Sequence, residues 1–172
     1  MSFDIYYQTC NLGTGTARRK NPFTGAIESV PIDDGLSVSE RAAVETLLRS
    51  SGATGPDQFG CYVLDLPDGG SAEVFARGLG GAEPFDGLMV AARSLTLGLA
   101  SFLWELCRAG NMVAMPVMEE EVAAVASEAQ RARVQSRWPE AVVVGSASEF
   151  SHLLNGGFAA WQSYRDQVAR PQ

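Results

Sequence analysis

The chain has 172 residues, of which 46% are hydrophobic and 19% are charged, values typical of one globular domain over residues 1–172 with a substantial core. Its formal net charge of −7 argues against nucleic-acid binding, because phosphate contacts need a basic surface. No apolar run approaches the roughly 20 residues that span a membrane, and no basic signal-peptide region opens the sequence, so we expect a cytoplasmic protein without membrane contact.

The first third of the chain predicts, in order, a strand, a loop, an edge strand and a helix, over residues 3–9, 10–25, 26–32 and 36–51. Aromatic residues and isoleucine favour the first strand, whereas Gly, Asn and Pro punctuate the loop. Pro31 lacks a backbone donor, which places the second strand at a sheet edge. Ser37 and Glu40 form a capping box that starts the helix.

The middle of the chain predicts a hairpin. Strands are expected over residues 59–66 and 71–76, and the turn at 67–70 contains Asp-Gly and Gly-Gly, which readily adopt positive φ. Residues 77–93 are rich in glycine and are expected to be mostly loop, with a short strand at 88–91.

The most apolar stretch of the chain, residues 94–118, predicts a buried helix followed by a buried strand. Leucines and Phe recur at three- and four-residue spacing after Ser94, which is the expected N-cap. Gly110 and Asn111 end the helix, because both tolerate the left-handed conformation. The run 112–118 is apolar on both faces, and Pro116 belongs at a bulge or near the strand end.

The C-terminal third leaves one choice open. Residues 119–137 fit either one helix or a short return strand at 122–126 followed by a helix that Ser127 caps, and we favour the strand. A strand at 141–145 and a helix from Ser146 follow. The Gly pair at 156–157 is expected to weaken or break that helix, at roughly 1 kcal/mol per Gly.

These interleaved helices and strands, with at least one hairpin, predict an α+β fold: a mixed β-sheet with helices packed on it, an α/β sandwich. The sequence contains no motif that predicts an enzyme. Cys10, Cys61 and Cys107 are far apart and have no CxxC spacing, which indicates buried thiols rather than disulfides or a zinc site. His152, the only histidine, lies on the polar side of a helix, so we predict no catalytic residue, metal or cofactor.

Two charged segments are the candidate sites. Glu119, Glu120 and Glu121 form an acidic patch at a strand end, which is either a solvated turn or the rim of a site for a basic protein. Arg18, Arg19 and Lys20 follow Gly13 and Gly15, and such a basic, Gly-containing loop can cradle a phosphate, although it matches neither common phosphate-binding motif. Met112, Met115 and Met118 favour core filling over an adaptable binding surface.

Three segments together, FDIYYQT, NPFTG and a helix ending in LCRAGNMV, resemble small bacterial proteins of uncharacterised α/β families. Some of these accompany secreted toxins as immunity proteins. The likeness covers most of the chain and carries over no active residues. It implies a bacterial, cytoplasmic protein with a protein-binding role.

The sequence therefore supports three hypotheses. The first is a non-catalytic, immunity-type binding protein for a basic partner, with residues 119–121 and the loop 11–25 as contacts. The alternative is a binder of, or an enzyme acting on, a small phosphate-containing ligand held by Arg18, Arg19 and Lys20. The third is a homo-oligomer, for which an exposed apolar patch around Phe158 and Trp161 would be the sign.

Overall fold

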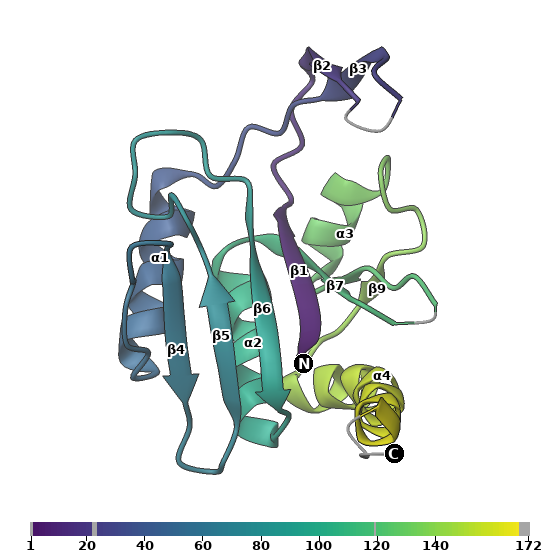
Figure 1. Ribbon diagram of the computed structural model, residues 1–172. Helices are drawn as coiled ribbons and strands as arrows, with labels where there is room; N and C mark the ends of the chain where they lie inside the picture. The colour runs from purple at the N-terminus through teal and green to yellow at the C-terminus, as the bar shows by residue number, and fades with distance from the viewer. Residues whose placement is uncertain (1, 22–23, 119, 169–172) are drawn as a thin grey trace.

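The computed structural model describes residues 2–21, 24–118 and 120–168. Within them the chain forms a mixed seven-stranded sheet, a separate two-stranded sheet and four helices, which confirms the predicted α+β fold (Figure 1). The strands are β1 (Phe3–Thr9), β2 (Thr16–Lys20), β3 (Ile27–Pro31), β4 (Cys61–Asp65), β5 (Ser71–Phe75), β6 (Gly87–Ser94), β7 (Met112–Pro116), β8 (Ala124–Val125) and β9 (Val142–Val143). The helices are α1 (Val38–Ser50), α2 (Leu97–Ala109), α3 (Glu128–Val134) and α4 (Ala147–Val168).

The first strand of the sequence lies at the centre of the large sheet. The strand order is β4-β5-β6-β1-β7-β8-β9, and every neighbouring pair is antiparallel except β8 and β9. Side chains alternate along β1, so that Phe3, Ile5 and Tyr7 are buried on one face. Helices α1 and α2 lie on this face (Figure 1), and α4 packs against α2 and contributes Phe158 to the same core. The Tyr7 hydroxyl donates a hydrogen bond to the Leu103 carbonyl at 3.0 Å.

A smaller core lies on the opposite face, at the β7–β9 end of the sheet. Val113 points away from the main core because it pairs with Gln8 rather than with Ile5 or Tyr7. It packs with Val134 of α3 and with Val125 and Ala141. Helix α3 therefore covers only this end, and the β4-β5-β6-β1 part of that face carries no helix (Figure 1).

The helix ends follow local chemistry. The predicted capping box of α1 is present, with the Glu40 N–H donating to Ser37 Oγ at 3.3 Å and the Ser37 N–H donating to Glu40 Oε2 at 2.7 Å. The prediction that Ser94 is the N-cap of α2 is wrong, because Ser94 still belongs to β6. Thr96 caps α2 instead, and its side chain accepts a hydrogen bond from the Leu99 N–H at 3.1 Å. At the other end of α2, Asn111 takes the left-handed conformation with φ 48°.

Two segments predicted as loops contain strands. Residues 16–20 of the predicted loop 10–25 form β2, which pairs only with β3. Residues 77–93 were expected to contain a short strand at 88–91, but β6 runs for eight residues and pairs with both β1 and β5. The small residues of β6 pack closely between strands β1 and β5. Glycine is required at position 87 of this strand, since a Cβ would lie 2.1 Å from the Tyr7 carbonyl oxygen.

The C-terminal predictions have mixed outcomes. The strand-plus-helix interpretation of residues 119–137 is confirmed by β8 and α3, with Ser127 as the N-cap. Helix α4 runs unbroken through the Gly pair, so the break that was one of the two expected effects is wrong, and the weakening stays a prediction. Gly157 lets the helix approach the core, because a Cβ there would meet Met118 Sδ at 2.3 Å. No helix within the described ranges is long and apolar enough to span a membrane.

Candidate interaction groove

A groove of about 640 Å³ opens on the uncovered face of the sheet, beside the small core. Strands β1 and β7 form one wall, and the segments on either side of β8 and α3 form the other. Its apolar lining includes Tyr6, Met115, Val117, Val122, Trp138 and Pro139. Two carboxylates, Glu121 and Glu140, also line it.

The sheet register produces the first wall. Tyr6 lies between Ile5 and Tyr7 in β1 and therefore points to the opposite face, where 47% of it is exposed. Met115 is its direct partner on β7. The Val117 N–H donates to the Asp4 carbonyl at 2.9 Å, which keeps the chain alongside β1 beyond Pro116 and leaves Val117 56% exposed.

The end of α3 produces the second wall. The Trp138 N–H donates to the Val134 carbonyl at 2.9 Å, so the indole follows directly from the last helical turn and packs beside the small core. Arg137 lies over the Trp138 ring at 5.4 Å and makes two hydrogen bonds to Asp33, at 2.7 and 2.8 Å. The Asp33 carboxylate is buried, and it neutralises the Arg137 guanidinium where that side chain lines the groove.

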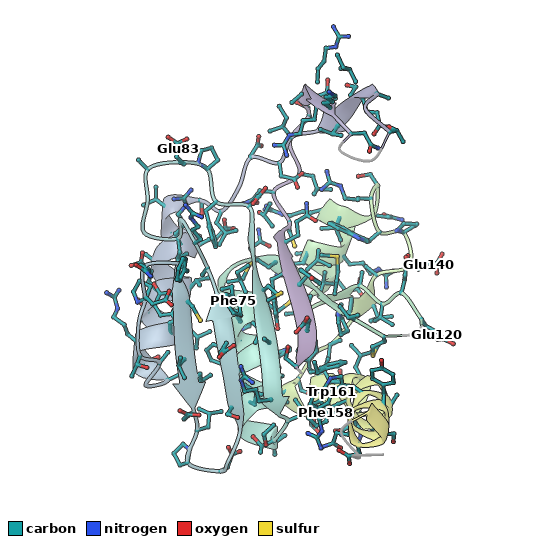
Figure 2. The ribbon with its side chains drawn as sticks, in the orientation of Figure 1. Phe75, Glu83, Glu120, Glu140, Phe158 and Trp161 are labelled. Carbon is teal, nitrogen blue, oxygen red and sulfur yellow. The ribbon has the colours of Figure 1, made fainter. Side chains whose placement is uncertain are left out.

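The rim of the groove carries net negative charge. Glu120, Glu121 and Glu140 are exposed, and Figure 2 shows Glu120 and Glu140 projecting from the β7–β9 side of the molecule. Across residues 2–21, 24–118 and 120–168, none of the three makes a hydrogen bond or ion pair. Because Arg137 is already neutralised, these carboxylates have no counter-charge from the described part of this chain.

An apolar row leads across the sheet into the groove. Cys61 pairs with Phe75, Phe75 with Met89, Met89 with Tyr6, and Tyr6 with Met115, so one side chain from each of five strands shares the uncovered face. Phe75 is 37% exposed and lies near the middle of the sheet in Figure 2. We call these five residues the apolar row.

The predicted acidic site is placed in part at this groove. Glu121 lines it, Glu120 is the exposed residue before Glu121 in the sequence, and Glu119 lies outside the described residues. The sequence alone did not indicate Tyr6, Trp138 or Glu140. Tyr6 had a signal in the alternation of β1, but Trp138 and Glu140 come together with it only through the turn after α3. Of the methionines, Met112 is buried as predicted, while Met115 and Met118 are half-buried at the groove.

The predicted basic site is an extended strand instead of a loop. Strand β2 places Arg18 and Lys20 on one side and Arg19 on the other, so the three cations do not converge on one point. All three side chains are exposed, and in the part of the chain that the structure describes none of them makes a side-chain hydrogen bond or ion pair. Phosphate binding by these residues stays a prediction.

The reactive side chains that the sequence offered are dispersed. Burial raises the pKa of the Cys10 and Cys107 thiols to about 12, which makes both poor nucleophiles. His152 is exposed on α4. Within the described ranges, no group of three or more His, Cys, Asp or Glu side chains could hold a metal ion.

The Phe158 region is not the exposed patch that a homo-oligomer would show there. Phe158 is only 7% exposed and packs edge-to-face against Phe3, with ring centroids 5.7 Å apart. Trp161 is half-buried, and its ring lies 5.0 Å from that of Phe158. These residues are therefore part of the contact between α4 and the main core.

A polar cluster at one end of the sheet holds three segments together. The Glu40 carboxylate accepts hydrogen bonds from the side-chain amides of Asn11 and Asn111, both at 2.8 Å, and from the Ser37 N–H. Partial burial would raise the pKa of Glu40, but these hydrogen bonds outweigh it and the pKa is lowered. Because the carboxylate already has several donors, we assign it a structural role that joins β1, α1 and the α2–β7 turn.

Comparisons of the chain with protein-family models, with curated proteins and with solved structures find no match.

Proposed function

We propose that this protein is a non-catalytic binding protein that holds a basic segment of a protein partner in the groove. The observation that carries the proposal is an apolar floor beside Trp138 with carboxylates at its rim that have no counter-charge among the described residues. Burial of an apolar side chain would supply affinity, and Lys or Arg residues next to it would pair with Glu121 and Glu140. The proposal includes the immunity-type role in the bacterial cytoplasm that the resemblance implies.

The apolar row supports a contact larger than the groove itself. A stable protein interface buries roughly 800 Å² on each partner, which is more than a few side chains in one groove provide. The row extends the apolar surface from Met115 across four more strands to Cys61. Exposed aromatic residues such as Tyr6 and Phe75 are typical anchors of protein interfaces.

Titration with two synthetic peptides of equal length tests this proposal. One peptide alternates Lys and Leu, and the other alternates Glu and Leu. We expect the Lys–Leu peptide to bind and to change the fluorescence of the protein, because Trp138 would lose contact with water. The Glu–Leu peptide is expected not to bind, because it would meet the carboxylates of the rim. Equal binding of both peptides would contradict the proposal.

Two double variants with the same change in net charge provide the matched control. Glu121→Lys with Glu140→Lys reverses the rim, whereas Glu45→Lys with Glu83→Lys changes carboxylates of α1 and of the loop before β6. We expect the rim variant to bind the Lys–Leu peptide about tenfold more weakly, or about 1.4 kcal/mol, and the control to bind it with nearly unchanged affinity. Equal weakening in both variants would indicate attraction by overall charge alone and would reject the groove.

A further inference from the structure

The two strands β2 and β3, which we call the arm, stand away from the rest of the molecule (Figure 1). They pair only with each other. A two-stranded sheet of this kind is marginally stable in water unless it packs on something else. The arm therefore gains stability when another surface covers one of its faces.

The two faces of the arm differ in chemistry. Lys20 lies opposite Ile27 and Arg18 opposite Ser29, so one face combines two cations with an isoleucine that is 62% exposed. On the other face Arg19 lies opposite Glu28, so its charges balance. The first of these, which we call the cationic face, joins apolar and basic groups in the same way that the groove joins apolar and acidic groups.

The charge distribution of the chain points to the same match. The arm contains three cations and one acid, a net charge of +2, which leaves −9 on the rest of the chain. The groove is complementary to the arm in charge, because Glu121 and Glu140 line it beside apolar side chains. The arm and the groove belong to the same sequence, so every copy of the protein carries both.

The base of the arm is attached to the body by hydrogen bonds. The Asp34 N–H donates to the Asn11 carbonyl at 3.0 Å, and the Asn11 side chain donates to the Gly35 carbonyl at 3.0 Å. The Asp33 carboxylate binds Arg137 through two hydrogen bonds. These contacts hold both ends of the arm at the body, while its strands point away from it (Figure 1).

We propose that the cationic face of the arm binds the acid-rimmed groove of a second copy of this chain, so that two copies exchange arms around a two-fold axis. Ile27 then contacts the apolar floor, and Arg18 and Lys20 pair with the carboxylates of the rim. The exchange is reciprocal, as in other symmetric dimers, and buries two identical contacts. This inference rests on the proposed function, since it assigns the basic segment that the groove holds to the arm of the partner copy.

Sedimentation velocity of two charge-reversed variants tests the arm exchange. One carries Arg18→Glu with Lys20→Glu, and the other carries Glu121→Lys with Glu140→Lys. We expect the wild type to dimerise and each variant alone to dissociate, with a dissociation constant raised at least about tenfold. An equimolar mixture of the two variants is expected to dimerise again, because each arm then meets a groove of opposite charge. A mixture that stays monomeric would overturn the proposal.

Two neighbouring cations of the arm, Arg18 and Arg19, provide a matched control because they lie on opposite faces. Arg18→Gln removes a cation from the cationic face and Arg19→Gln removes one from the opposite face, with the same change in charge. We expect the first substitution to weaken dimerisation and the second to leave it nearly unchanged. Equal effects would exclude the assigned face.

The Lys–Leu peptide separates this inference from the proposed function. A wild type that is monomeric up to about 0.5 mM yet binds the peptide would overturn the arm exchange and keep the groove as a site for another protein. A protein that neither dimerises nor binds the peptide would overturn both. If the arm occupies the groove, the arm-reversed variant is expected to bind the peptide more tightly than the wild type does.

Discussion

The two faces of the seven-stranded sheet are made by the same strands but differ in how far they are buried. In β1, Ile5 is fully buried under the helices, whereas the next residue, Tyr6, is 47% exposed on the other face. Helices α1 and α2 lie on the first face and α4 adds to the same core, whereas α3 covers only one end of the second face (Figure 1). Most of the buried core therefore lies on one face, which leaves aromatic side chains of the other face available for contact.

The largest expected difference in the free energy of unfolding is between substitutions of two neighbouring residues of β1. We expect Ile5→Ala to lower the free energy of unfolding by about 3 kcal/mol, because it leaves a cavity in the main core. Tyr6→Ala is expected to change it by less than about 1 kcal/mol, since an exposed side chain loses few contacts. Urea denaturation followed by circular dichroism measures both values. Similar losses for the two variants would show that the outer face is covered as well.

Gly156 and Gly157 of α4 allow a similar comparison between two neighbouring positions of a helix. A Cβ added at Gly156 would have no neighbouring atom within 4 Å, so Gly156→Ala is expected to raise stability by up to about 1 kcal/mol through helix propensity. At Gly157 the new Cβ would meet Met118 and lie 3.3 Å from Phe3. We therefore expect Gly157→Ala to be about 1–3 kcal/mol less stable than Gly156→Ala in thermal denaturation. Equal stability of the two would mean that α4 packs less closely on the core.

The polar cluster at the end of the sheet should respond to pH. The pKa of Glu40 is lowered in the folded state, so its contribution is present above the ordinary carboxyl pKa and is lost as the pH falls through the lowered value. We expect Glu40→Gln to cost about 1–2 kcal/mol at pH 7 and progressively less on acidification from about pH 5. Urea denaturation at several pH values checks this, with Glu45→Gln on the same helix as the control. A constant difference across the pH range would contradict the charged role of Glu40.

The smallest expected effect concerns the reactivity of the three cysteine thiols and leaves the stability of the fold unchanged. Cys107 lies in the main core and Cys10 in the small core, and both thiols have a pKa of about 12. Cys61 is half-buried on the open face, and burial raises its pKa to a lesser extent. We therefore expect a disulfide reagent at pH 8 to modify Cys61 alone, as counted by mass spectrometry of the native protein. Modification of Cys107 at a similar rate would show that the helix layer opens.

Local signals made much of the fold predictable. The aromatic and β-branched residues of the strand at 3–9, the capping box of Ser37 and Glu40, and the Asp-Gly turn at 67–70 are all local signals, and the three predicted features are confirmed. The length of β6 was missed because its pairing with β1 and β5 comes from distant segments. Propensity alone could not decide such pairing.

The groove was predictable only in part, for the same reason. The acidic run at 119–121 indicated one side of the rim. The floor joins Tyr6, Met115 and Trp138, which come together through the register of β1 with β7 and through the turn after α3. Strand β2 was predicted as part of a loop because Gly, Asn and Pro residues surround it, whereas β3 was recognised as the edge strand at 26–32.

The central place of β1 has a consequence for synthesis of the chain. Phe3 pairs with Ala92 and Thr9 pairs with Met112. Strand β1 leaves the ribosome before the other strands, so it cannot pair until β6 and β7 have been synthesised. At typical rates of about 5–20 residues per second, the delay before Ala92 is made is roughly 4–18 s. The β4–β5 hairpin can form during that interval, because both of its strands precede Ala92 in the sequence. We therefore expect nascent chains truncated before residue 87 to expose β1 as an unpaired, apolar strand, which makes them substrates for chaperones.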